Sequence, residues 1–148
     1  MTARAVTLHR VFTSTPERVF RAFTTPAAMA KWLPPNGFVA EVQQMDARAG
    51  GSWHMSFTAL GTGHSHGFGG RYLDFEPGQR LRYTATFDDP QLPGEMQTTV
   101  TLRAVSCGVE LNVVQEGIPE VIPLEGCTLG WQESLALLKL LVEAEIPG

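Results

Sequence analysis

The chain has 148 residues, of which 43% are hydrophobic and 18% charged, and its net charge is -4 at neutral pH. This is the length of one domain, so we expect residues 1–148 to form a single unit with a core that needs no disulfide or metal. The acidic balance does not suit a phosphate backbone, no apolar run reaches the ~20 residues that span a membrane, and the N-terminus lacks a signal-peptide core. We therefore expect no nucleic-acid partner, no membrane partner and a cytoplasmic location.

The N-terminal part of the chain predicts one strand followed by two short helices. Apolar and polar residues alternate over residues 3–13, which is typical of a strand buried on one face. Ser14-Thr15-Pro16-Glu17 then predicts a helix start, because a hydroxyl side chain caps a helix and proline fits its first turn. Thr25-Pro26 repeats this signal and predicts a second helix over residues 27–33, which ends at Pro34-Pro35 because proline cannot continue the hydrogen-bond ladder.

The middle of the chain predicts a run of antiparallel strands. The apolar period changes to two, and strands are expected at residues 38–46, 52–59, 66–75, 80–88, 96–104 and 109–113. Short turns join them, and the first of these contains Gly50 and Gly51, which can adopt the positive φ that tight turns require. Consecutive strands joined by such short turns pair antiparallel.

The C-terminal segment predicts the longest helix, over residues 124–145. Apolar side chains recur along it at helical spacing, and Leu137 and Leu140 widen the stripe, so we expect burial on more than one side. Seven strands and one apolar helix share a core only when the sheet curls around the helix. The predicted fold is therefore α+β: a curved seven-stranded antiparallel sheet around a long C-terminal helix, with two short helices after the first strand.

Five short motifs follow one another along nearly the whole chain. They are Ser14-Thr15-Pro16-Glu17-Arg18-Val19-Phe20-Arg21-Ala22-Phe23-Thr24, Trp32-Leu33-Pro34, Ala49-Gly50-Gly51-Ser52-Trp53, Gly70-Arg71-Tyr72-Leu73-Asp74-Phe75-Glu76-Pro77, and Gly130-Trp131 with Leu135 and Leu138. In residues and in order they resemble the activator of Hsp-90 ATPase homologue family (AHSA-like), within the START / Bet v 1-like SRPBCC superfamily. Cys107-Gly108-Val109 departs from the Gly-Gly-Thr that many members carry, which alters one hairpin and not the architecture.

The resemblance implies the helix-grip fold, in which the sheet grips the C-terminal helix and encloses a cavity. It also implies three kinds of function. Members of the superfamily bind small apolar molecules, some are cyclases or related enzymes, and the eukaryotic co-chaperone activates Hsp-90. The co-chaperone joins such a domain to a separate N-terminal domain, which these 148 residues do not include. An Hsp-90-type chaperone is therefore the least favoured of the expected partners.

A pocket is predicted from strand parity together with this resemblance. If Trp53 points inward, alternation places a set of aromatic and apolar side chains on the concave face, and the C-terminal helix adds three more. The candidate ligand-binding residues are Trp53, Met55, Phe57, His66, Phe68, Tyr72, Tyr83, Phe87, Trp131, Leu135 and Leu138. Tyr72 and Tyr83 are the expected polar contacts, because a buried phenol needs a hydrogen-bond partner. The alternative is that these side chains fill a solid core.

Two charged residues share the parity of inward side chains. Arg10 aligns with Leu8 and Phe12 of the first strand, so it either meets an anionic ligand or lies at the strand edge in solvent. Asp74 aligns with Tyr72 unless a β-bulge lies between them. A parity error would reverse all of these assignments together.

The histidines and cysteines do not predict a metal centre or a nucleophile. His64 and His66 are spaced like two metal ligands, but His54 is expected to point outward, which leaves no third ligand. Cys107 and Cys127 lie in no CxxC pair, and we expect two free thiols rather than a disulfide. The sequence contains no G-x-S-x-G, H-E-x-x-H or phosphate-loop motif. We expect no metal and no cofactor, and no catalytic pair is identified.

The leading hypothesis is a protein that binds a small hydrophobic, aromatic or lipid-like molecule, with little or no catalysis. An enzyme of the polyketide cyclase or hydrolase type is an alternative, and it requires two polar groups that converge inside the pocket. A protein-interaction module is another, either as a homodimer or as a chaperone regulator, and it requires an exposed apolar patch.

Overall fold

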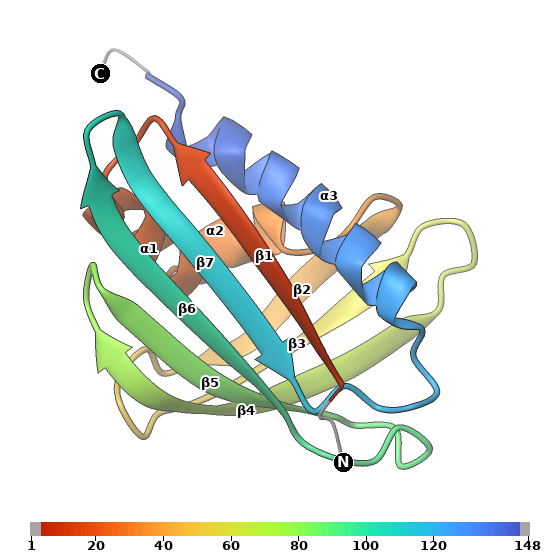
Figure 1. Ribbon diagram of the computed structural model, residues 1–148. Coiled ribbons are helices and arrows are strands. Elements are labelled where there is room, and N and C mark those ends of the chain that lie inside the picture. The colour runs from red at the N-terminus through yellow and green to blue at the C-terminus, as the bar shows by residue number, and fades with distance from the viewer. Residues whose placement is uncertain (1–3, 146–148) are drawn as a thin grey trace.

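A computed structural model describes residues 4–145, which form one sheet and three helices (Figure 1). In chain order the elements are β1 (Ala5–Phe12), α1 (Pro16–Thr24), α2 (Pro26–Trp32), β2 (Phe38–Met45), β3 (Ser52–Ala59), β4 (Ser65–Glu76), β5 (Arg80–Phe87), β6 (Met96–Val105), β7 (Gly108–Glu116) and α3 (Leu124–Val142). The predicted α+β helix-grip fold is confirmed. Residue 3, where the first strand was expected to begin, lies outside the described residues. Within residues 4–145, no helix is long and apolar enough to cross a membrane.

All neighbouring strands of the seven-stranded sheet run antiparallel, in the order β1-β7-β6-β5-β4-β3-β2. Strands β2 to β7 follow one another as hairpins, whereas β1 pairs with β7, the last strand of the chain. The register places Ala5 opposite Glu116 and Phe12 opposite Val109. Because β1 and β2 are the two edges of the sheet, α1 and α2 must connect one edge to the other. Figure 1 shows the sheet curling around α3, with α1 and α2 on the same side.

The two short helices begin where the sequence predicted a cap followed by proline. Thr15 Oγ1 accepts a hydrogen bond from the backbone N–H of Arg18 at 3.2 Å, and Pro16 occupies the first turn of α1. Thr25 is at the N-cap of α2, but its side chain makes no capping hydrogen bond. The apolar face of α1 packs into the core through Val19, Phe20, Ala22 and Phe23.

The C-terminal end of α3 is capped by residues around the start of α1. The last carbonyls of a helix have no partner within it. Arg18 Nη1 donates to the carbonyl oxygens of Val142 at 3.2 Å and Ala144 at 3.4 Å, and Ser14 Oγ donates to Val142 at 2.8 Å. These contacts fix α3 relative to α1 at one end of the molecule.

One face of α3 is buried against the sheet and the short helices. Its buried residues are Trp131, Ser134, Leu135, Leu138 and Val142. Leu129 and Leu140, by contrast, are 55% and 72% exposed. The prediction that this helix is buried on more than one side is therefore wrong, because the sheet curls around one face of α3 and leaves the other in solvent.

A bulge in β4 decides the position of Asp74. The register between β4 and β5 shifts between Tyr72 and Asp74. Tyr72 is buried on the concave face, whereas Asp74 forms ion pairs with Arg80 at 3.2 Å and Arg82 at 3.1 Å. The extra residue reverses the parity of the strand, so the carboxylate of Asp74 does not belong to the pocket.

Glycine is required at two places that shape the sheet. Gly50 has a φ of 80° in the turn between β2 and β3, as its sequence context predicted. A Cβ at Gly70 would lie 2.0 Å from the carbonyl oxygen of Thr84 on β5. Gly70 therefore permits the close approach of β4 and β5 beside the Tyr72 and Tyr83 pair.

Candidate ligand-binding pocket

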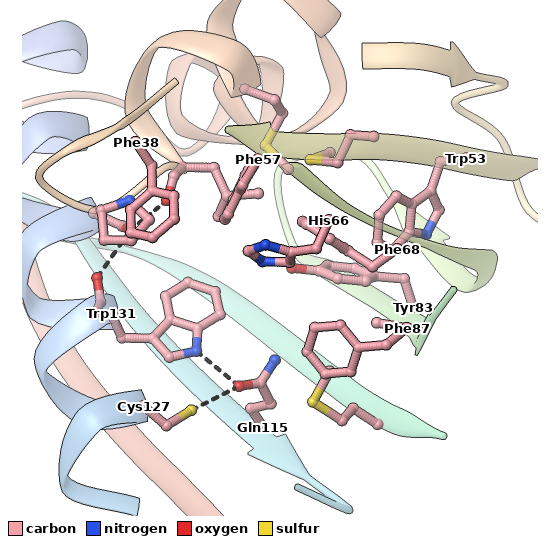
Figure 2. A pocket seen from close by; sticks show the side chains of 18 of the residues that line it. Phe38, Trp53, Phe57, His66, Phe68, Tyr83, Phe87, Gln115, Cys127 and Trp131 are labelled. Carbon is pink, nitrogen blue, oxygen red and sulfur yellow. Dashed lines mark hydrogen bonds between the residues drawn. The ribbon is translucent and has the colours of Figure 1, made fainter. Parts of the chain in front are cut away.

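A cavity of about 460 Å³ lies between the concave face of the sheet and the N-terminal half of α3 (Figure 2). This volume is within the range of small-molecule sites, about 300–1,000 Å³. The sheet supplies one wall, α3 a second, and Phe23 and Met29 from the short helices, with Leu33 just after α2, a third. Ile118 and Ile122, from the segment between β7 and α3, close the remaining side.

Arg4 holds this last segment in place from outside the pocket. Its Nη1 donates to the carbonyl oxygen of Pro119 at 2.5 Å, and its Nη2 donates to that of Ile122 at 2.6 Å. Two hydrogen bonds from one guanidinium fix the loop more firmly than a single contact would. The wall formed by the loop is thus attached to the start of the chain.

Most of the candidate residues line this cavity. They are Trp53, Met55, Phe57, His66, Phe68, Tyr72, Tyr83, Phe87 and Trp131. Leu135 and Leu138 were also expected in the lining, but they lie farther along α3 and are 1% and 0% exposed in the solid core. The difference arises because α1 and α2 contact α3 and fill the space between helix and sheet at that end. That the lining side chains contact a ligand stays a prediction.

Several lining residues were missed by reasoning from strand parity alone. They include Phe38 and Met45 on β2, Met96 on β6, Gln115 on β7 and Cys127 on α3. Two of them carried a usable signal. Gln115 continues the inward parity of Leu111 and Val113, and Cys127 lies one helical turn before Trp131.

Where the pocket opens, its rim is aromatic. His66 is exposed, and its ring lies 6.1 Å from those of both Phe38 and Phe57, with edge-to-face geometry. Deeper in, Phe57 and Phe68 are 4.8 Å apart, and Phe68 and Phe87 are 6.1 Å apart. These rings come from four adjacent strands, β2 to β5 (Figure 2). A ligand that enters here meets π-faces and ring edges first.

The interior of the pocket is uncharged. Among the described residues, no Asp, Glu, Lys or Arg belongs to the lining. Burial raises the pKa of Tyr72 to about 12, with a smaller contribution from the charge of Asp46, and burial raises the pKa of Tyr83 further still. Burial also raises the pKa of the Cys127 thiol, although the charge of Arg4 opposes this in part. The two phenols and the thiol are therefore neutral at pH 7.

A hydrogen-bonded group of side chains centres on Gln115. Its Oε1 accepts from Trp131 Nε1 at 3.0 Å and from Cys127 Sγ at 3.3 Å (Figure 2). Its Nε2 donates to Thr98 Oγ1 at 3.3 Å. Thr98 is in turn the cross-strand partner of Tyr83 on β5, and its hydroxyl partly offsets the rise in the Tyr83 pKa. A row of polar side chains thus runs beside the pocket from α3 across β7 and β6 to β5.

Trp53 contributes a further polar atom to the pocket wall. Its side chain is 5% exposed, and its Nε1 has no hydrogen-bond partner among the described residues. The indole packs edge-to-face against Tyr83 and Phe68, both at 5.7 Å. Aromatic contacts, rather than a hydrogen bond, thus hold Trp53 in the wall.

The other charged and metal-ligating candidates lie outside the pocket. Arg10 shares the buried face of β1, but its guanidinium donates to the carbonyl oxygen of His9 at 2.7 Å and is no part of the lining. His54 points outward as predicted, and its ring nitrogens lie 2.9 Å from Gln43 Oε1 and 2.7 Å from Asp88 Oδ2. Residues 4–145 contain no group of three or more His, Cys, Asp or Glu arranged to hold a metal ion. Both cysteines are free thiols, as expected.

A sheet curled around a long C-terminal helix, with an apolar cavity between them, defines a helix-grip protein. The family model described as "Activator of Hsp90 ATPase homolog 1-like protein" matches residues 13–143. The chain therefore belongs to this family, as its motifs indicated. No curated protein matches the chain.

Solved structures agree with this assignment. A protein from Chromobacterium violaceum is 57% identical, with a TM-score of 0.94 over 95% of this chain and 98% of that chain. An AHSA1-like protein from Aeromonas hydrophila is 18% identical, with a TM-score of 0.77 over 95% of this chain and 92% of that chain. A protein from Rhodobacter sphaeroides is 24% identical, with a TM-score of 0.80 over 93% of this chain and 90% of that chain. The last two similarities show a shared fold.

Proposed function

We propose that this protein binds a small hydrophobic molecule, aromatic or lipid-like, in the cavity between the sheet and α3. The observation that carries the proposal is a cavity of about 460 Å³ with a largely aromatic and methionine lining. Protein interiors are close-packed, so a space of this size beside a solid core needs a reason. Methionine side chains adapt to ligands of irregular shape, and aromatic side chains supply large apolar contact areas.

The chemistry of the lining favours binding over catalysis. General acid–base catalysis works best with groups whose pKa lies near the operating pH. Burial instead raises the pKa values of Tyr72, Tyr83 and Cys127 above their ordinary values, so these groups exchange protons poorly at pH 7. A thiol with a raised pKa is also a weak nucleophile. An enzyme of the cyclase or hydrolase type would need a proton-transferring pair; apart from these three groups, the lining offers within the described residues a single imidazole, that of His66 at the exposed rim.

A substitution at Gly130 tests the site directly. Gly130 lines the pocket on α3, and a Cβ there would meet nothing within 4 Å. Gly130→Leu should occupy part of the cavity while improving the helix propensity at this position. The matched control is Ala136→Leu, which adds the same side chain on the solvent face of α3.

The assay is a titration with N-phenyl-1-naphthylamine, a neutral apolar dye whose emission rises in apolar surroundings. The wild type and Ala136→Leu should bind the dye equally, and Gly130→Leu should bind it at least about tenfold more weakly, since the leucine takes up space beside Trp131 that the dye needs. Thermal unfolding should show that all three proteins are folded. Equal binding by Gly130→Leu would place the dye elsewhere and contradict the proposal.

A further inference from the structure

The hydrogen bonds around Gln115 have a direction that its neighbours determine. The indole N–H of Trp131 can only donate, so the amide atom of Gln115 that faces it must be the oxygen. The thiol of Cys127 donates to the same oxygen. The NH₂ group of Gln115 therefore faces Thr98 and donates to its Oγ1 at 3.3 Å. The orientation of the Gln115 amide is thus determined by the indole N–H of Trp131, which can donate a hydrogen bond but cannot accept one.

Tyr83 lies next to Thr98 as its cross-strand partner on β5. Thr98 is 0% exposed, so its hydroxyl hydrogen needs an acceptor, and the Tyr83 hydroxyl is beside it. A hydroxyl can accept one hydrogen bond while it donates another, so Tyr83 can accept from Thr98 and still donate its own hydrogen to a second partner. Tyr83 lines the pocket, and Figure 2 shows its ring lying among the residues that surround the cavity. Its hydroxyl hydrogen can therefore be donated to a group inside the pocket.

The lining also limits the charge of that group. An ionised ligand deep in the pocket would lose its hydration without gaining a counter-charge, since no Asp, Glu, Lys or Arg among residues 4–145 belongs to the lining and His66 lies at the exposed rim. Burial keeps the Tyr83 phenol protonated, because its raised pKa lies well above neutrality. A neutral donor in apolar surroundings is best matched by a neutral acceptor.

We propose that the pocket selects uncharged apolar molecules that carry a hydrogen-bond acceptor, such as a ketone or amide carbonyl, and that Tyr83 donates the selecting hydrogen bond. This inference rests on the proposed binding function and adds the chemical class of the ligand. The apolar walls supply most of the affinity. Tyr83 supplies discrimination, because a carbonyl buried without a donor costs far more than one that is paired.

Three naphthalenes of nearly equal shape separate these contributions. They are 2-acetylnaphthalene, which carries a neutral acceptor, 2-ethylnaphthalene, which carries none, and 2-naphthoate, which is anionic. Dissociation constants are measured for the wild type and for Tyr83→Phe, by the change in fluorescence of the pocket tryptophans Trp53 and Trp131. The preference for 2-acetylnaphthalene is the dissociation constant of 2-ethylnaphthalene divided by that of 2-acetylnaphthalene.

Tyr83→Phe should reduce this preference by about 5-fold to 150-fold, as expected for a buried carbonyl that loses its donor. The affinity for 2-ethylnaphthalene should hardly change, and 2-naphthoate should bind the wild type more weakly than the ketone. An unchanged preference in Tyr83→Phe, or tighter binding of 2-naphthoate, would overturn the inference and leave the proposed binding function intact. If no probe binds the wild type, the proposed function fails and the inference fails with it.

A vibrational measurement gives a second test that needs no variant. The carbonyl stretch of 2-acetylnaphthalene bound to the wild type should shift to lower frequency than in a hydrocarbon solvent, because a hydrogen bond weakens the C=O bond. A stretch at the hydrocarbon frequency would show an unpaired carbonyl and contradict the role of Tyr83. This result stands even if Tyr83→Phe fails to fold.

Discussion

Truncating Leu138 to alanine should lower the free energy of unfolding by about 3–5 kcal/mol. The side chain is 0% exposed and lies in the solid core at the C-terminal half of α3. Removing three buried carbon atoms costs roughly 2.4 kcal/mol at about 0.8 kcal/mol each, and the cavity that remains adds to this loss. The prediction therefore depends on Leu138 lying in packed surroundings and not beside existing empty space.

Leu33 provides the matched control, because it is a leucine that lines the pocket and is half-buried. Leu33→Ala removes the same atoms but only enlarges a cavity that already exists, so a loss of about 1–2 kcal/mol is expected. Both variants are compared with the wild type by urea unfolding, followed by far-UV circular dichroism, with the m-values checked for equality. A loss for Leu138→Ala that does not exceed that for Leu33→Ala would refute the distinction between core and pocket.

Three further predictions concern caps and titratable groups. Thr15→Ala should cost about 0.5–2 kcal/mol of stability in urea unfolding, because it removes the side-chain cap of α1, whereas Thr25→Ala should cost much less. The phenolate absorbance of Tyr72 should appear only near pH 12 in the folded protein, that of Tyr83 at higher pH still, and both near pH 10 in concentrated guanidinium. Because the unfolded chain releases the two phenolic protons more readily, the free energy of unfolding should fall as the pH rises above 10. Ionisation of Tyr72 or Tyr83 near pH 10 in the folded protein would contradict the burial of these phenols. Cys127 should react with iodoacetamide at pH 8 more slowly than the exposed Cys107, and an apolar ligand in the pocket should slow the reaction of Cys127 further. Equal alkylation rates of the two cysteines, measured by mass spectrometry, would contradict the burial of Cys127 in the pocket wall.

The fold could be predicted because its determinants are local. Hydrophobic periodicity distinguished the strands from the helices, and proline and glycine marked the turns. The two-residue alternation also placed Trp53, Met55 and Tyr83 on the correct face. What local pattern could not show was the bulge after Tyr72, which one unpaired residue creates and which moves Asp74 to the other face.

The extent of the pocket depends on contacts that are distant in the sequence. Leu135 and Leu138 follow Trp131 on the same face of α3, so periodicity cannot separate them from it. The separation arises because the short helices, more than a hundred residues earlier in the chain, occupy the space beside them. The role of Gln115 has a similar origin, since its partners come from β6 and α3 and meet only in the folded chain.

Because one end of α3 borders empty space and the other end is packed, the two halves of this helix face different mutational constraints. Substitutions around Gly130 change the shape of a void, so they alter what fits inside without removing contacts that hold the domain together. Substitutions around Leu138 change the packed interior, and most of them are expected to lower stability. Under the proposed binding function, variation in one half of the helix would change the ligand preference while the other half preserves the scaffold. The same division shows where a directed-evolution library should be randomised and where it should not.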